Sequence, residues 1–320
     1  MVLSPGADRL HLEDDHDLFF FSAAQLRDLT ILASVPDWRE KSRFAVCWLQ
    51  EIWARDISDR NHLFDILNQF DHVICPFYHS LEPLRNRLSV PVTYLPWGVD
   101  AELFCPYPNP PERVIDVAGI GVVPKATEQA LIRYTDEIGG FFHYQTVFGP
   151  SEARSHSDHR HNYAGLLKRS KYFLCYAAKF TNAERGRQVE FGLRYVEGVA
   201  AGTVMLGDAI DNPAYREWFG WPDAVIPLSP DATDPAALIR QLEREPERMA
   251  AVRRANLTAA LTRLDNLYRW RDVLKLAGLP ETPGMQARQA RLHSLAEQVR
   301  TASLDMQVEE LPRPEAALRH

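Results

Sequence analysis

Residues 189–204 of this 320-residue chain read VEFGLRYVEGVAAGTV, in which charged side chains precede a run of small residues. If the stretch is helical, Glu190, Arg194 and Glu197 recur at spacings of four and three and lie along one face. The opposite face is apolar and could pack on a sheet. Two interpretations stay open from these residues alone: an amphipathic helix with one surface ion pair, or a helix with a ligand-binding face.

The composition is that of a globular protein with two domains of ordinary size. Hydrophobic residues make up 46% of the chain and charged residues 25%, and 320 residues are enough for two cores. The formal net charge is -7, whereas affinity for nucleic acid comes mostly from clustered Lys and Arg. The composition therefore argues against a general nucleic-acid binder.

The cysteines and the N-terminus predict a cytoplasmic protein. The four cysteines are scattered singly and form no metal-binding or disulfide pattern, so we expect reduced core residues at Cys47, Cys75, Cys105 and Cys175. The acidic N-terminus lacks the basic start and long apolar stretch of a signal peptide. No apolar run approaches the length of a membrane span, so we expect any membrane contact to be peripheral.

Short apolar runs alternate with helical patterns, which predicts parallel α/β sheets. Strands are expected at 17–23, 44–49, 72–77 and 92–97, and then at 113–121, 141–149, 171–178, 203–208 and 223–228. In the second half, helices are expected at 125–138, 161–169, 190–201, 212–218, 233–244 and 246–277.

A proline-rich stretch, CPYPNPPE at 105–112, divides the two halves. Its four prolines within six residues cannot continue a helix or a central strand. We therefore expect a reduced N-terminal α/β domain over 1–104, a linker, and a second Rossmann-like domain over 113–280. An amphipathic helix at 286–304 lies in the C-terminal extension, 281–320.

Polar and glycine-rich loops follow the expected strands of the second half, where an open parallel sheet binds its ligands. AGIGVVPK places Gly119, Gly121 and Lys125 directly after a strand, and such a loop lets backbone, helix end and lysine meet an anion. AAKFTNAERGRQ carries three cations, Lys179, Arg185 and Arg187, which suit a phosphate or diphosphate. A tight turn and a solvated loop are the respective alternatives.

The order of these segments resembles the two-Rossmann-domain, or GT-B, glycosyltransferases, especially their group 1 and spore-maturation-type members. YLPWGVDAELFCP at 94–106 is similar to the segment that closes their first domain. Gly119 and Lys125 have the spacing of their glycine loop and lysine, and RYVEGVAAGTVMLGD at 194–208 is similar to their nucleotide-binding helix. The resemblance covers roughly residues 70–280.

The resemblance implies an enzyme that moves a sugar from a nucleotide-diphosphate sugar, such as a UDP-sugar, to an acceptor, with retention at the anomeric carbon. It implies that Lys125, with Arg185 or Arg187, binds the diphosphate. Glu197 would bind the ribose, and Gly202 would permit close packing beneath. The donor-binding candidates are Gly119, Gly121, Lys125, Arg185, Arg187, Arg194, Glu197 and Gly202. Members of this class need no bound metal or cofactor.

Two departures from the family pattern concern the donor contacts. Retaining members often carry glutamates on both sides of a Phe-Gly-Leu; here Glu197 is in register, but Val189 stands in the first position and Glu190 follows one place late. The arginine usual after the loop glycine is Ile120. Glu190 and an arginine of the second loop are the candidates to substitute.

The N-terminal half is short for this family, and much of the usual acceptor platform is missing. CPFYHS at 75–80 ends a strand with His79, which could bind the donor sugar or act as a base; capping the next helix is the alternative. CWLQEIW at 47–53 offers Trp48 and Trp53 to a sugar acceptor, or to the core. The candidates for catalysis are Glu190, Lys125 and His79.

Other features leave the function and partners open. HSDHRH at 156–161 has no compact ligand spacing, so we expect a solvated loop and no metal. The acceptor stays undefined among glycans, lipid-linked groups, small molecules and proteins. The main alternative function is a non-catalytic or partner-dependent subunit that binds a nucleotide sugar; a sugar-nucleotide epimerase or hydrolase is a third hypothesis. The small first domain and the terminal helix favour self-association.

Overall fold

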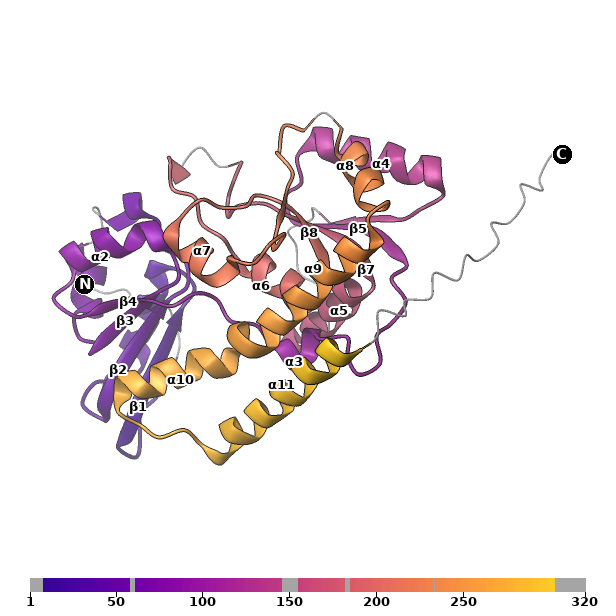
Figure 1. The fold of residues 1–320 in the computed structure, drawn as a ribbon. Helices are drawn as coiled ribbons and strands as arrows, with labels where there is room; N and C mark the ends of the chain where they lie inside the picture. Colours follow the sequence, from indigo (N-terminus) through magenta and orange to yellow (C-terminus); the bar gives the residue numbers. More distant parts are fainter. Residues whose placement is uncertain (1–7, 58–60, 146–154, 182–184, 233, 303–320) are drawn as a thin grey trace.

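The computed structural model describes residues 8–57, 61–145, 155–181, 185–232 and 234–302. The chain forms two parallel sheets, as the alternating apolar runs predict (Figure 1). The first sheet has the order β1-β2-β3-β4. Its strands are β1 (His16–Ala23), β2 (Ser42–Leu49), β3 (His72–Cys75) and β4 (Val92–Tyr94). All its neighbouring strands pair in parallel, with Phe20 opposite Val46 in the register of β1 and β2.

Short helices connect the strands of the first sheet and enclose an aromatic core. Phe64 and Phe70 are fully buried there, and Trp38 lies 4.6 Å from the ring of Phe70. The connecting elements are η1 (Leu26–Ser34), η2 (Ala54–Ile57), α1 (Asn61–Leu67), η3 (Tyr78–Ser80) and α2 (Leu81–Arg87).

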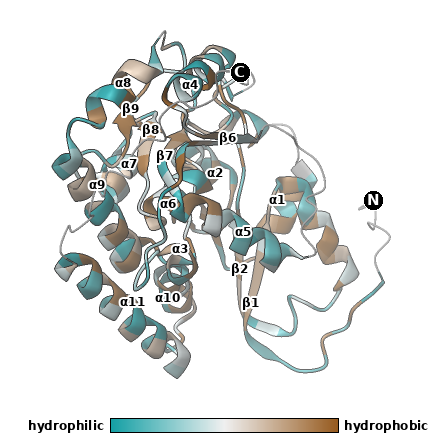
Figure 2. Ribbon diagram, turned by 90° about the vertical axis from the view of Figure 1, so that its right-hand side faces the viewer, coloured by the Kyte–Doolittle hydropathy of each residue, from teal (hydrophilic) through white to brown (hydrophobic). Residues whose placement is uncertain are grey.

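The second sheet has five parallel strands in the order β6-β5-β7-β8-β9. Its strands are β5 (Ile115–Ile120), β6 (Phe142–Gln145), β7 (Ser170–Cys175), β8 (Val204–Gly207) and β9 (Ile226–Pro227). Its helices are α4 (Lys125–Ile138), α5 (His156–Lys168), α6 (Leu193–Ala200), α7 (Pro213–Phe219), α8 (Pro235–Leu242) and α9 (Pro246–Ala259). Figure 2 shows hydrophobic residues on β1, β2 and β9 and hydrophilic turns on α5 and α9.

The chain crosses between the two units twice. The outward crossing contains α3 (Ala101–Phe104), and the return runs through a π-helical turn (Ala260–Leu264) into α10 (Asn266–Ala277). The two crossings are bonded to each other, since Val99 N donates to Leu264 O at 3.0 Å. α10 then packs on the first sheet, where Val273 is buried in one cluster with Val46, Ile74 and Leu95. The domain limits at 104 and 113 stay a prediction.

A last helix, α11 (Pro283–Thr301), lies along the second unit (Figure 1). Its Leu292, Ala296 and Val299 are buried in the same cluster as Leu257 of α9. Among the residues that the structure describes, no helix is long and apolar enough to span a membrane. The four cysteines are free and buried, which confirms that they are reduced core residues.

Three sequence expectations about helices were wrong. The single helix expected at 246–277 is broken at Asp265, whose backbone is extended between the π-helical turn and α10. The helix expected from residue 190 begins at Leu193, because Gly192 at the N-cap is extended, so Glu190 does not share a helical face with Arg194 and Glu197. HSDHRH is not a loop but the first turns of α5. Its start is capped by Ser155, whose Oγ accepts from Asp158 N at 3.1 Å.

Candidate active site

The glycine loop after β5 brings Gly121 and Arg194 together. Gly121 has φ of +86°, a left-handed conformation that favours glycine. A Cβ at Gly121 would also collide with Nη2 of Arg194, so the guanidinium lies directly on the loop backbone. The chain then enters α4, whose first residue is the exposed Lys125. The carboxyl end of β5 therefore holds two cations and a helix N-terminus.

Gly119 and Gly202 allow close packing and do not lie in an open loop. A Cβ at Gly119 would lie 3.0 Å from Val123 and 3.3 Å from Phe142, so this glycine lets β5 pack closely. Gly202 follows α6 at the end away from Arg194, with φ of +64°. A Cβ there would lie 2.8 Å from Leu257 of α9.

Glu197 lies one turn further into α6 and is paired with an arginine. Glu197 as a whole residue is 3% exposed, and its Oε1 accepts from Arg160 Nη1 at 2.6 Å. The Arg160 guanidinium also lies over the rings of Phe104 and Tyr163, at 5.0 and 5.5 Å from their centroids. Burial, followed by the negative charge of Glu197, raises the pKa of Tyr163 well above its usual value.

Arg160 was missed by the sequence analysis. It lies inside HSDHRH, where the histidines drew attention to metal binding. The capping serine before this stretch, followed by an aspartate three residues later, is the signal that predicts a helix start here. Among the described residues, no three His, Cys, Asp or Glu side chains are grouped as metal ligands; the absence of a metal remains a prediction.

Glu190 crosses from the second unit to the first. Its carboxylate is 1% exposed and accepts from the backbone N–H groups of Tyr78 and His79, both at 2.9 Å. The His79 ring adds a contact of 3.1 Å between Nδ1 and Oε1, and Gln188 Nε2 donates to Oε1 at 3.0 Å. Two catalytic candidates 111 residues apart are thus in direct contact.

Gln188 adds a second bridge between the units. Its Oε1 accepts from Ala54 N at 2.9 Å, and its Nε2 donates to Ser80 Oγ at 2.9 Å. The side chain of Ser80 in turn donates to Ile52 O at 2.6 Å. The segment before α6 is therefore hydrogen-bonded to the loops that follow β2 and β3.

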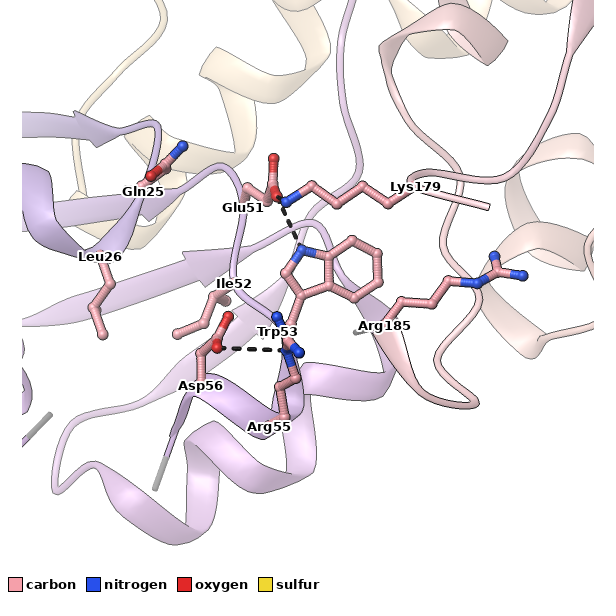
Figure 3. A pocket seen from close by; sticks show the side chains of 9 residues that line it. All are labelled: Gln25, Leu26, Glu51, Ile52, Trp53, Arg55, Asp56, Lys179 and Arg185. Carbon is pink, nitrogen blue, oxygen red and sulfur yellow. Dashed lines mark hydrogen bonds and ion pairs between the residues drawn. The ribbon is translucent and has the colours of Figure 1, made fainter. Parts of the chain in front are cut away.

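A polar pocket lies beside these bridges, between the loops after β1 and β2 and the segment after β7 (Figure 3). Lys179 reaches across to pair with Glu51, which also accepts from Trp53 Nε1 at 2.9 Å. Arg55 pairs with Asp56 at 3.6 Å on the opposite wall. Trp48 is separated from this pocket, because it packs with Phe20 in the cluster beneath α10.

The two loop arginines are placed differently from the pocket's ion pairs. Figure 3 shows the guanidinium of Arg185 directed away from Glu51 and Asp56, toward the second unit. Its Nη1 is buried and has no hydrogen-bond partner among the residues that the structure describes. Arg187 is exposed. The structure thus groups Lys125, Arg194 and Gly121 at one strand end and His79 with Glu190 between the units.

Two parallel α/β units with a glycine loop, a lysine and an acidic helix at the second sheet's carboxyl edge define the GT-B class of glycosyltransferase fold. Residues 109–275, just over half of the chain, match the model of a family described as glycosyl transferase-like. The chain belongs to this family. Its assignment to the spore-maturation-type subgroup stays a prediction.

Solved structures resemble this chain at low sequence identity. TarM superposes with a TM-score of 0.51 at 12% identity, over 82% of this chain and 56% of TarM. HepE from Anabaena, in complex with UDP-glucose, gives a TM-score of 0.49 at 12% identity, over 88% of this chain and 78% of HepE. A chain of the GtfA/B complex gives a TM-score of 0.44 at 12% sequence identity, over 89% of this chain and 58% of that chain.

The similarity to TarM shows the fold alone. The chain spans little more than half of the length of TarM and of the GtfA/B chain. No curated protein sequence matches it.

Proposed function

We propose that this protein transfers a sugar from a nucleotide-diphosphate sugar to an acceptor. The observation that carries the proposal is the Arg194 guanidinium on the backbone of Gly121. The loop lacks the arginine usual in this class, with Ile120 at that position. Arg194 brings a guanidinium to the same loop from α6, and a bidentate cation suits a diphosphate.

Lys125 completes the proposed diphosphate site. It opens α4, a helix of 14 residues whose N-terminus follows the glycine loop. Free N–H groups at a helix N-terminus and the helix dipole both favour an anion. Arg185 is a further candidate, since its buried Nη1 lacks a partner among the described residues; exposed Arg187 is the weaker one.

Glu197 is the proposed ribose ligand. Its pair with Arg160 fixes the position of the carboxylate, and a fixed carboxylate can accept hydrogen bonds from two vicinal hydroxyls. The donor would then lie across the carboxyl ends of β5 and β7, with its sugar toward the first unit.

Catalysis in this arrangement would be electrostatic. Cations on the leaving diphosphate stabilise the charge that develops as the anomeric carbon gains oxocarbenium character. The acceptor would enter from the first unit, beside Glu51 and Trp53. Retention is the outcome that the sequence resemblance implies, with no metal or other cofactor. A cytoplasmic location and self-association also remain proposals.

One observation favours a non-catalytic or partner-dependent subunit as the second candidate. The Glu190 carboxylate already accepts hydrogen bonds from Tyr78, His79 and Gln188. It therefore has little capacity left for a donor sugar. A subunit of this kind would bind the nucleotide sugar without turning it over.

The test is a thermal-shift titration with nucleoside diphosphates and their sugars. A ligand that binds only the folded protein raises Tm with its excess over Kd. We expect one nucleotide series to raise Tm, and Arg194→Gln to lose most of this response. Arg133→Gln, at an exposed position of α4, is the matched control. No response to any nucleotide at millimolar concentration would contradict the proposal.

A further inference from the structure

Arg269 carries a buried guanidinium at the junction of the two units. The residue is 2% exposed. It lies on α10, which returns from the second unit and packs on the first sheet (Figure 1). Burial lowers the pKa of Arg269 to about 10, which still leaves the side chain charged at neutral pH. A full positive charge is therefore held out of water.

This guanidinium has no anionic partner. Its Nη2 reaches Trp97 O at 3.5 Å, but Nε and Nη1 are buried and bond to nothing in the part of the chain that the structure describes. The strongest negative charge acting on it is that of Asp272, one turn along α10, and the two residues form no ion pair. A buried charge without a partner is costly, so proteins usually place an opposite charge beside it.

Three other unpartnered donors lie next to Arg269. Its guanidinium lies over the ring of Trp218, 4.4 Å from the centroid. The charge of Arg269 acts on the hydroxyl of Tyr94. Trp97 is next to Gly98, where an added Cβ would lie 2.9 Å from Arg269 Cγ. The Tyr94 hydroxyl and the Nε1 atoms of both tryptophans are buried, and no described residue forms a hydrogen bond with them.

Both units contribute to this group of side chains, which we call the Arg269 site. Tyr94 ends β4 of the first sheet, and both Tyr94 and Trp97 pack against the buried clusters of the two units. Trp218 lies on α7 and packs against the cluster of the second unit. The members of the Arg269 site are Tyr94, Trp97, Trp218 and Arg269. A ligand bonded to them would hold the two units together.

All members of the Arg269 site can donate hydrogen bonds. Guanidinium and indole nitrogens only donate, and a tyrosine hydroxyl can donate one bond. Their common complement is a negatively charged acceptor. Its charge is limited, because one guanidinium balances a single negative charge, and Glu190 and Glu217 already act on Tyr94. The unpartnered atoms are closed off from solvent, which favours a compact ion.

We propose that the Arg269 site binds a small monovalent anion, such as chloride, and that the bound anion links the two units. It supplies the negative charge that the buried guanidinium lacks, and it accepts hydrogen bonds from the neighbouring N–H and O–H groups. This site is separate from the proposed diphosphate site at Lys125 and Arg194, and it does not depend on sugar transfer. Its test therefore needs no donor and no acceptor.

The first experiment titrates sodium chloride and measures Tm, while sodium isethionate, which has a bulkier anion, keeps the ionic strength constant. An anion that binds only the folded protein raises Tm by a similar increment for each tenfold excess over Kd. We expect this rise in the native protein and none in Arg269→Met, which keeps a long side chain but removes the charge. No rise in the native protein, or an equal rise in Arg269→Met, would overturn the inference.

Arg263→Met is the matched control. Arg263 lies over the same indole, 5.8 Å from the centroid of Trp218, but it is exposed and its Nη2 donates to Glu217 O at 2.6 Å. The Arg263→Met variant should keep the chloride response. Loss of the response in both variants would indicate a general effect of positive charge and would overturn the site.

Tyr94→Phe decides the matter if Arg269→Met does not fold. It removes one hydroxyl donor, so the Kd for chloride should rise about tenfold. Tyr268→Phe is its control, because the Tyr268 hydroxyl already donates to Leu261 O at 2.9 Å, and its Kd should not change. An unchanged Kd in Tyr94→Phe contradicts the inference.

Crystals grown in sodium bromide locate the ion directly, because bromide replaces chloride and is visible by its anomalous scattering. We expect a peak within hydrogen-bond distance of Arg269 Nε or Nη1. Bromide only beside Lys125 and Arg194, with a chloride response that Arg194→Gln abolishes, overturns the inference and leaves the proposed function standing. Bromide beside Arg269 in a protein that binds no nucleotide supports this site and overturns the proposed function.

Discussion

Arg160 Nη1 lies 2.6 Å from Glu197 Oε1, and this pair joins α5 to α6 at the carboxyl edge of the second sheet. The side chain of Glu197 is 4% exposed and that of Arg160 is 25% exposed. The charge of this buried carboxylate is therefore compensated by an arginine that is itself held largely out of water.

Removing that arginine should cost more stability than removing both charges. Arg160→Gln leaves a buried carboxylate without its cation, a change that costs roughly 3 kcal/mol. The double variant Arg160→Gln, Glu197→Gln should recover much of that loss. Urea unfolding of the two variants measures both values, and equal loss in both would show that the charge pair is unimportant.

Because the Arg194 guanidinium lies on the backbone of Gly121, a methyl group added at residue 121 should weaken donor binding. Gly121→Ala strains a backbone with φ of +86°, at a cost of about 1–2 kcal/mol, and also displaces the guanidinium. We expect donor affinity to fall at least tenfold in a thermal-shift or calorimetric titration.

Gly139→Ala is its control, because Gly139 has φ of +64° but a Cβ added there would meet no described atom within 4 Å. The Gly139→Ala variant therefore introduces the backbone strain without a contact to Arg194. If both variants lose donor affinity equally, the loss does not come from Arg194.

Because Gln188 bridges the two units, removing its side chain should loosen their arrangement. Gln188→Ala removes the hydrogen bonds to Ala54 and Ser80 and leaves buried partners unsatisfied, which costs about 1–3 kcal/mol. Small-angle scattering should show a larger radius of gyration for this variant. Gln241→Ala, exposed on α8, should scatter like the native protein; an unchanged radius in Gln188→Ala would refute the bridging role.

His79 also predicts how stability changes with pH. Its pKa is raised in the folded protein above the ordinary 6.5, mainly by Glu190. The protonated ring therefore stabilises the fold below pH 6.5, and this contribution is lost as pH rises through the folded pKa. The Tm difference between the native protein and His79→Gln should shrink over that window. A difference that grows with pH would contradict the pairing.

The sequence predicted the helices and strands more closely than it predicted the contacts between them. The helix at 125–138 begins and ends as expected, because Pro124 precedes it and Gly139 caps it in the left-handed conformation. The apolar runs likewise marked the strands, since both faces of a parallel sheet are buried.

The site's contacts depended on residues far apart in the chain. Helical spacing grouped Glu190 with Arg194, but its carboxylate binds the first unit instead. His79 and Glu190 were separate candidates, and nothing in their spacing reveals a bond across 111 residues. Arg160 was hidden in a stretch interpreted as a loop, so the partner of Glu197 was missed.

In the proposed function, a nucleotide-diphosphate sugar binds at the carboxyl edge of the second sheet. A crystal structure with the most stabilising nucleoside diphosphate tests it most directly. We expect the diphosphate within hydrogen-bond distance of Lys125 and Arg194, with the ribose hydroxyls on Glu197. A nucleotide bound elsewhere, with these three side chains untouched, would contradict it.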